Sequence, residues 1–136
     1  MLAIDVFPGV IDFGELAVGN SSGDDIIINV TNWGNMDFNL TLDGYGTEDG
    51  DNIAMNCSKG NISIDLERYS VVFNESYDVM VNLTDTATVV GNFSLPHRTD
   101  DISYKSDRNN TYWKISIPPG IQGNCTGIVV FNTIQI

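Results

Sequence analysis

Asparagine followed two positions later by serine or threonine is the most frequent pattern of chemical significance in this chain. Ten of the fifteen asparagines begin such a motif, although the Ser and Thr content would give only about two by chance. Asn-x-Ser/Thr is the acceptor signal for N-linked glycan on the surface of secreted proteins. The acceptors are Asn20, Asn29, Asn39, Asn56, Asn61, Asn74, Asn82, Asn92, Asn109 and Asn124. The pattern predicts an extracellular, heavily N-glycosylated protein.

The two cysteines, Cys57 and Cys125, form an even number in a chain with secretory features. In that setting a disulfide between them is the default expectation. Together with the single histidine, His97, they fall short of the four ligands of a structural zinc site.

No residues with catalytic spacing are found. His97 lies in the polar segment LPHRTDD, and no nucleophile elbow or activated cysteine accompanies it. A carboxylate pair for glycoside hydrolysis can be chosen anywhere in so Asp-rich a chain, and nothing selects one pair. We therefore expect no catalytic residues and no enzyme; an enzyme would require an acid–base pair in a cleft.

The Gly/Asp segment 43–52 is the stronger candidate for binding a hard cation, and Asp100, Asp101 and Asp107 are a weaker one. It carries Asp43, Glu48, Asp49 and Asp51, and Ca²⁺ prefers carboxylate and carbonyl oxygens. The spacing does not match an EF-hand loop, so Asp49 and Asp51 are weak calcium candidates against a plain solvated acidic loop. No other metal or cofactor is expected.

Composition excludes several classes of partner. The chain has 136 residues, a net charge of −12 and only six dispersed basic residues. Nucleic acid and anionic membrane surfaces both require clustered Lys and Arg, so neither is expected as a partner. No apolar run is long enough for a transmembrane helix, and the N-terminus lacks the features of a secretion signal. We expect that a signal was removed or that the chain is a piece of a longer surface protein.

Period-two alternation of apolar and polar residues predicts the elements that must position the acceptor motifs. It is clearest at Phe38, Leu40 and Leu42, and it recurs over 77–83 and in a final strand over 125–136. No helical periodicity is found. The chain therefore predicts a single all-β domain, 1–136: an immunoglobulin-like antiparallel β-sandwich of about eight or nine strands with one disulfide.

The acceptor motif and the strand pattern share one register. Successive side chains on a strand point to opposite faces, so Asn-x-Ser/Thr directs the Asn and the hydroxyl outward and x inward. In seven motifs the x residue is apolar or cysteine: Val30, Leu40, Cys57, Ile62, Leu83, Phe93 and Cys125. The two cysteines are thereby predicted on inward faces, which supports their pairing.

The N-terminal third resembles the abnormal-spindle/hydin-type immunoglobulin-like domains. The resemblance covers roughly residues 2–45, in FPGVIDFGELAVG and then IIINVTNWGNMDFNLTL, with Gly14, Gly19 and Gly34 as turn glycines. The segment WKISIPPGIQGNCTGIVVF, within 113–131, is similar to the final hairpin of related prokaryotic surface modules. The resemblance implies a β-sandwich used as a spacer, anchor or assembly module.

The two ends of the chain carry more apolar residues than one strand face can use. They are Leu2, Ile4 and Val6, with Ile128, Val130, Ile134 and Ile136. Two explanations stay open. Segments 1–8 and 127–136 pair with neighbouring subunits as donated strands, or both strands are central and doubly buried within one subunit. Because acceptors are absent from 1–19 and 127–136, we expect any interfaces there.

These features favour a structural subunit of a cell-surface filament, pilus-like appendage or array. Its partners would be copies of itself and other surface proteins, and the acidic, glycosylated exterior favours an archaeal source. The alternative is a surface adhesin or carbohydrate-binding module. That alternative would use exposed aromatics beside the Gly/Asp loop, drawn from Trp33, Tyr45, Tyr104, Tyr112 and Trp113. Of these, Trp113 alternates with core residues and Trp33 lies in a turn.

Overall fold

A computed structural model describes residues 4–7, 9, 11, 13, 19, 25–34, 37–95 and 108–135. The strands are β1 (Ile4–Phe7), β2 (Ile26–Asn32), β3 (Phe38–Tyr45), β4 (Ile53–Lys59), β5 (Asn61–Ser63), β6 (Glu67–Ser70), β7 (Val81–Asn82), β8 (Thr88–Leu95), β9 (Arg108–Ile115), β10 (Gln122–Thr126) and β11 (Ile128–Gln135). Two single 3-10 turns, η1 (Ile64–Leu66) and η2 (Tyr77–Val79), are the helical elements of the described residues. The predicted all-β class is confirmed.

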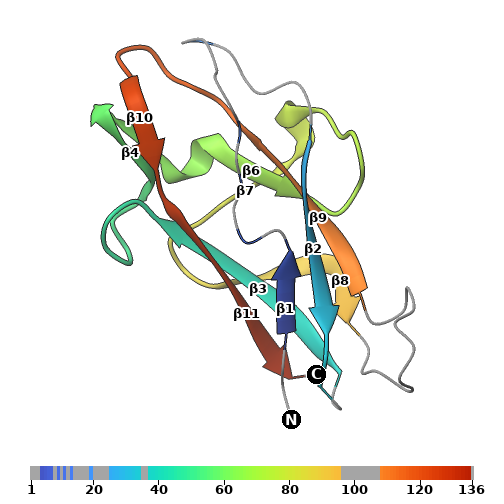
Figure 1. The fold of residues 1–136 in the computed structure, drawn as a ribbon. Coiled ribbons are helices and arrows are strands. Elements are labelled where there is room, and N and C mark those ends of the chain that lie inside the picture. Colours follow the sequence, from blue (N-terminus) through green and yellow to red (C-terminus); the bar gives the residue numbers. More distant parts are fainter. Residues whose placement is uncertain are drawn as a thin grey trace.

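The described strands form three antiparallel sheets. The first has the order β1-β2-β9-β6-β7, the second β11-β3-β8 and the third β10-β4-β5. β10 leads into β11 through Gly127, so the second and third sheets share a continuous path of chain (Figure 1). The arrangement is consistent with the predicted β-sandwich.

The hydrophobic core lies where inward-facing residues of the first sheet meet those of the other two. Trp113 on β9 is fully buried, and its ring contacts Tyr69 at 5.4 Å and Phe131 on β11 at 5.9 Å between centroids. Its Nε1 donates to Thr111 Oγ1 at 2.8 Å, which satisfies the indole inside the core. The predicted core role of Trp113 is confirmed.

The alternation expected on β3 is also confirmed. Phe38, Leu40 and Leu42 are at most 1% exposed, whereas Asn39 and Asp43 on the opposite face are partly exposed. Burial of one strand face supplies the apolar contacts. The other face is only partly exposed, because Thr41 on it is 8% exposed.

Three expectations about strands are wrong. The run 77–83 is not one strand, because Tyr77–Val79 form η2 and only Val81 and Asn82 pair in the sheet. A strand over 67–70 was not expected, yet β6 occupies it. The predicted final strand is two strands, because at Gly127 the chain passes so close to Ala54 that a Cβ would collide with its carbonyl. The described chain therefore has eleven strands instead of eight or nine.

Candidate functional sites

The acceptor asparagines lie mostly on outward faces. Exposed side chains are found at Asn61, Asn74, Asn82, Asn109 and Asn124, and partly exposed ones at Asn29, Asn39 and Asn56. Asn20 lies outside the described residues, and the described side chains do not include Asn92. Attachment of glycan at these positions stays a prediction.

The expected burial of the middle residue is confirmed at most described motifs. Val30, Leu40, Ile62, Leu83 and Phe93 are 0–3% exposed. The two cysteines in motifs are only partly buried. The same spacing that marks an acceptor thus also supplies inward side chains to the core.

Asn74 and Asn29 differ most in how accessible the side-chain amide is for attachment of a glycan. Asn74 is exposed in a turn with a positive φ of 61°, a backbone conformation that Asn tolerates better than most residues. Asn29 is held on the first sheet: its Nδ2 donates to Asn110 Oδ1 at 2.9 Å, and Thr31 Oγ1 donates to its Oδ1 at 3.0 Å. In the folded protein Asn74 is therefore the better-presented acceptor.

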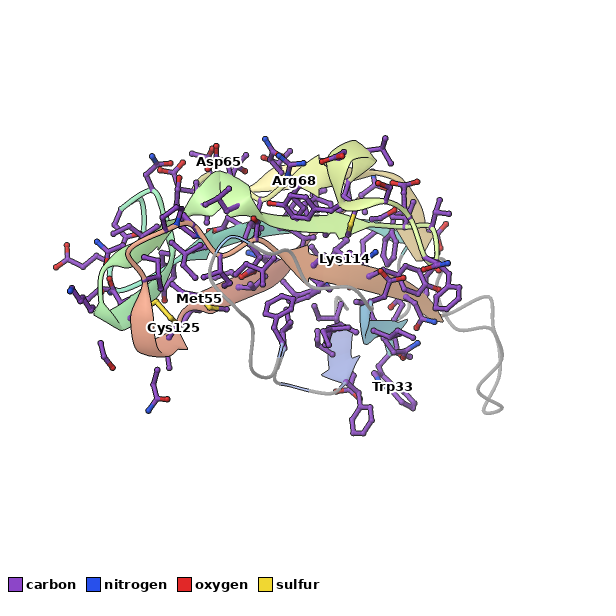
Figure 2. The ribbon with its side chains drawn as sticks, turned by 90° about the horizontal axis from the view of Figure 1, so that it is seen from above. Trp33, Met55, Asp65, Arg68, Lys114 and Cys125 are labelled. Atoms are coloured by element: carbon purple, nitrogen blue, oxygen red, sulfur yellow. A yellow bond between two sulfur atoms is a disulfide. The ribbon has the colours of Figure 1, made fainter. Side chains whose placement is uncertain are left out.

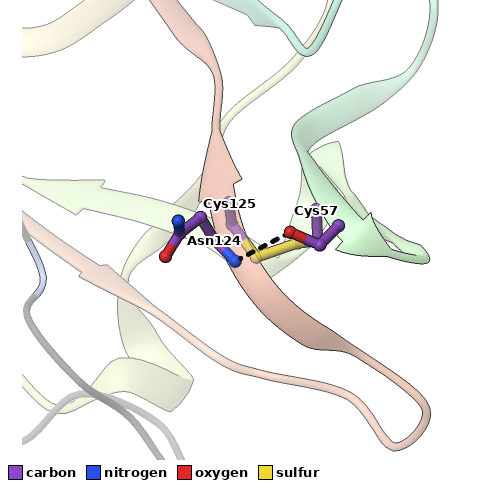
Figure 3. The surroundings of a disulfide bond; sticks show 4 residues. Cys57, Asn124 and Cys125 are labelled. Carbon is purple, nitrogen blue, oxygen red and sulfur yellow. Dashed lines mark hydrogen bonds between the residues drawn. A yellow bond between two sulfur atoms is a disulfide. The ribbon is translucent and has the colours of Figure 1, made fainter.

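The disulfide predicted from the cysteine pair is present. Cys57 on β4 and Cys125 on β10 lie directly opposite in the antiparallel register (Figure 3). Beside them, the backbone N–H of Asn124 donates to Ser58 Oγ at 3.1 Å. The two cysteines are the middle residues of the acceptor motifs at Asn56 and Asn124, which lie on adjacent strands.

Acceptor motifs divide the outer strands of the described sheets into two groups. β5, β7, β8 and β10 are outer strands, and each contains one acceptor: Asn61, Asn82, Asn92 or Asn124. β1 and β11 are also outer strands, and neither contains an acceptor. Among the described strands, the two acceptor-free outer strands are the first and the last.

The placement of β1 and β11 contradicts the explanation that both are central strands, while strand donation to a neighbouring subunit stays a prediction. Among the described residues, β1 pairs only with β2 and β11 only with β3, so neither strand is central. On β11, Ile128 and Ile134 are each 48% exposed, while Val130 is partly buried. On β1, Ile4 and Val6 are partly buried against the core. Leu2 and Ile136 lie outside the described residues.

A cavity of about 450 Å³ lies between β1 and β11. Its walls come from the start of the chain (Val6, Gly9, Ile11), from Gly127 and β11 (Ile128, Val129, Phe131), and from Ile28, Met55 and Glu67. Figure 1 shows β1 in dark blue and β11 in dark red, and Figure 2 labels Met55, which lines the cavity. The described side chains that line the cavity are apolar except for one carboxyl.

Glu67 is the polar group of that cavity, and sequence reasoning missed it. It faces inward opposite Ile115 in the β6–β9 register, is 2% exposed, and its Oε2 has no hydrogen-bond partner among the described residues. Burial raises the pKa of its carboxyl to about 8, so the side chain is protonated at neutral pH. The available signal was its parity with Tyr69, two residues on, which points into the core.

The Gly/Asp loop uses Asp51 as an acceptor for backbone groups. Its two carboxylate oxygens accept N–H groups of Gly46, Thr47, Glu48 and Ile53 at 2.9–3.2 Å. These bonds, that of Thr47 foremost, lower the pKa of Asp51 to about 2. Oxygens engaged in this way hold the turn, and among the described residues no three His, Cys, Asp or Glu side chains form a metal-ligand group.

Trp33, the aromatic residue that the sequence placed in a turn, is exposed to solvent. Trp33 follows β2, is 47% exposed and projects away from the sandwich (Figure 2). Tyr112 on β9 is partly buried and contacts Phe73 edge-on at 5.7 Å. His97 and Tyr104 lie outside the described residues. No helix of the described chain is long and apolar enough to cross a membrane.

Comparison with protein-family models, with curated proteins and with solved structures finds no match for this chain. The resemblance of residues 2–45 to hydin-type immunoglobulin-like domains therefore stays a prediction.

Proposed function

We propose that this chain is a heavily N-glycosylated, extracellular structural subunit, without catalytic activity. In this proposal it builds a cell-surface filament or array by strand pairing between copies. The observation that carries the proposal is the division of the outer strands. Four of them contain an acceptor, and the two that do not, β1 and β11, lie on either side of one apolar cavity.

An outer strand presents unpaired backbone groups and invites another strand to add to the sheet. A glycan on such a strand is bulky and solvated, so it opposes close approach by a neighbour. Glycans on β5, β7, β8 and β10 would protect those edges and leave β1 and β11 for pairing. The half-exposed Ile128 and Ile134 then lose contact with water when a neighbouring strand covers them.

Two further observations support an exterior setting. The Cys57–Cys125 disulfide is typical of proteins that fold in an oxidising compartment. The net charge of −12 favours solubility of a subunit before assembly and a cation-rich surrounding.

A single substitution tests whether the absence of an acceptor on an outer strand allows that strand to pair with a neighbouring subunit. Ile134→Thr completes an acceptor motif that begins at Asn132, which is exposed on β11. In the native glycosylating host we expect wild-type protein to form regular fibres or lattices in electron micrographs. The Ile134→Thr protein, with added glycan shown by intact mass, should stay dispersed.

The matched control is Asn132→Gln/Ile134→Thr, which carries the same loss of an apolar side chain but no acceptor. It should assemble better than the glycosylated single variant. Assembly of a variant with proven glycan at Asn132, or dispersed wild-type monomers, contradicts the proposal. Absence of any glycan on the native protein removes its premise.

The alternative, a surface adhesin or carbohydrate-binding module, is favoured by one observation, the projecting Trp33. Sugars stack on exposed aromatic faces, and an isolated module would need no assembly. Dispersed monomers that bind immobilised glycans and lose this binding on Trp33→Ala would support the alternative.

A further inference from the structure

The cavity lined by β1 and β11 contains a buried carboxyl, that of Glu67, which has no role in the proposed assembly. Glu67 lines the cavity, and its buried Oε2 has no hydrogen-bond partner among the described residues, whereas the surrounding side chains, such as Ile28, Met55 and Phe131, are apolar. A buried polar atom without a partner costs free energy that a suitable guest recovers. Among the described residues, Glu67 Oε2 therefore lacks a polar partner.

A cation is the partner that would hold this carboxyl in its ionised form, with the proton released to solvent. Burial raises the pKa of Glu67, and no Lys or Arg is found among the described residues that line the cavity. Glu67 is also the only titratable side chain among the described residues that line the cavity. The net charge of −12 attracts cations to the molecule and repels anions such as fatty-acid carboxylates.

The size and lining of the cavity describe the rest of the guest. About 450 Å³ lies within the range of small-molecule sites, and walls of this composition gain from an apolar guest. Such sites use few polar groups to fix orientation, and here one carboxyl is available.

We propose that this cavity binds a primary alkylammonium ion, with the hydrocarbon chain against Met55 and Phe131 and the ammonium group donating to Glu67 Oε2. The same chemistry has two sources: a free alkylamine, or the side chain of a lysine presented by another polypeptide. The proposal is independent of strand-mediated assembly, because it concerns a cavity within one subunit.

Calorimetric titration with n-hexylammonium chloride at pH 7 tests the site on the intact, disulfide-bonded protein. n-Hexanol is the matched probe, since it has the same chain and no charge. We expect the ammonium ion to bind at least tenfold more tightly than the alcohol, and Glu67→Gln to abolish the difference. Equal affinity for both probes, no binding of the ammonium ion, or full retention of its preference in Glu67→Gln overturns the proposal.

A second measurement on the wild-type protein does not depend on the folding of any variant. Glu67 is protonated in the empty cavity at pH 7, and pairing with an ammonium ion requires its carboxylate. Each bound ammonium ion should therefore release close to one proton to solvent, measured by titration in two buffers of different ionisation enthalpy. Binding without proton release contradicts pairing with Glu67.

The two sources are separated with peptides. A short strand peptide containing one lysine is compared with its leucine analogue and with free hexylammonium. Stronger binding of the lysine peptide than of hexylammonium assigns the site to a polypeptide side chain, and the reverse order assigns it to a free amine. Loss of fibres in the Ile134→Thr protein leaves these titrations unaffected, so the two proposals fail separately.

Discussion

The Gly/Asp loop and the cavity each contain one perturbed carboxyl, and the two are perturbed in opposite directions. Asp51 in the loop accepts four backbone N–H groups, and its pKa falls to about 2. Glu67 in the cavity has an oxygen without a donor, and its pKa rises to about 8.

The difference shows that acidic residues in this chain take their role from the donors that the fold brings to them. Asp51 stands in the most acidic, most visible loop of the sequence, and its oxygens are used to hold that loop. Glu67 lies in a segment without a recognisable motif, and its carboxyl keeps an unpaired oxygen that a ligand could bind. Calcium binding at Asp49 and Asp51 stays a prediction, although the oxygens of Asp51 already accept four backbone N–H groups.

The largest expected effect is the pH dependence of stability due to Glu67. Between pH 4.5 and 8 the folded protein holds a proton on Glu67 that the unfolded chain has released, so the free energy of unfolding falls as pH rises through this window. The full loss is roughly 5 kcal/mol, from 1.36 kcal/mol per pKa unit. Urea unfolding from pH 4.5 to 8.5 measures it.

Glu67→Gln is the control, because it keeps the shape and cannot ionise. Its stability should lack the fall between pH 4.5 and 8. An equal fall in both proteins would assign the slope to other groups and would break the contrast with Asp51.

A somewhat smaller effect is expected from the disulfide, which joins β4 to β10. β4 runs from the Gly/Asp loop to the cavity. Asp51 precedes this strand, and Met55 on it lines the cavity. The bond joins residues 68 positions apart, and removing it by Cys57→Ala/Cys125→Ala should cost about 4 kcal/mol in the chain-entropy model. Thermal unfolding with and without reductant measures the loss.

The same variant sharpens the comparison. Glu67 is on β6 and is not joined to the disulfide, so its pH-dependent fall in stability should persist in the double alanine protein. Disappearance of that fall would show that the cavity keeps its shape only when β4 and β10 are linked.

The smallest expected effect belongs to Asp51, whose carboxylate is exposed to solvent. Its folded pKa is lowered, so its contribution is present above about pH 4 and is lost as pH falls towards 2. Asp51→Asn should lower stability at neutral pH and weaken the acid-induced loss. Asp49→Asn, which removes the same charge from the same loop, should change both much less. Equal effects of the two substitutions would show that net charge, not the backbone bonds, sets the stability of the loop.

Local patterns predicted the fold class because strand alternation depends on neighbouring residues, and the count of two cysteines predicted the disulfide. The alternation of Phe38, Leu40 and Leu42 follows from strand geometry, and the acceptor spacing placed Val30, Leu40 and Ile62 inward for the same reason. The pattern failed at Tyr77–Val79, where side chains distant in sequence impose a turn. Tyr77 Oη donates to Leu66 O at 2.7 Å, and Arg68 lies over the Tyr77 ring at 4.3 Å.

By itself, the sequence determined which side chains face the core, where the acceptor motifs lie and that the two cysteines could pair. Each of these follows from the spacing of a few residues. Only the tertiary structure decided that β1 and β11 are outer strands, that both contribute to one cavity, and that Glu67 lies on its wall. Sheet order and burial depend on which distant strands pair, and that choice is made by packing of the whole chain.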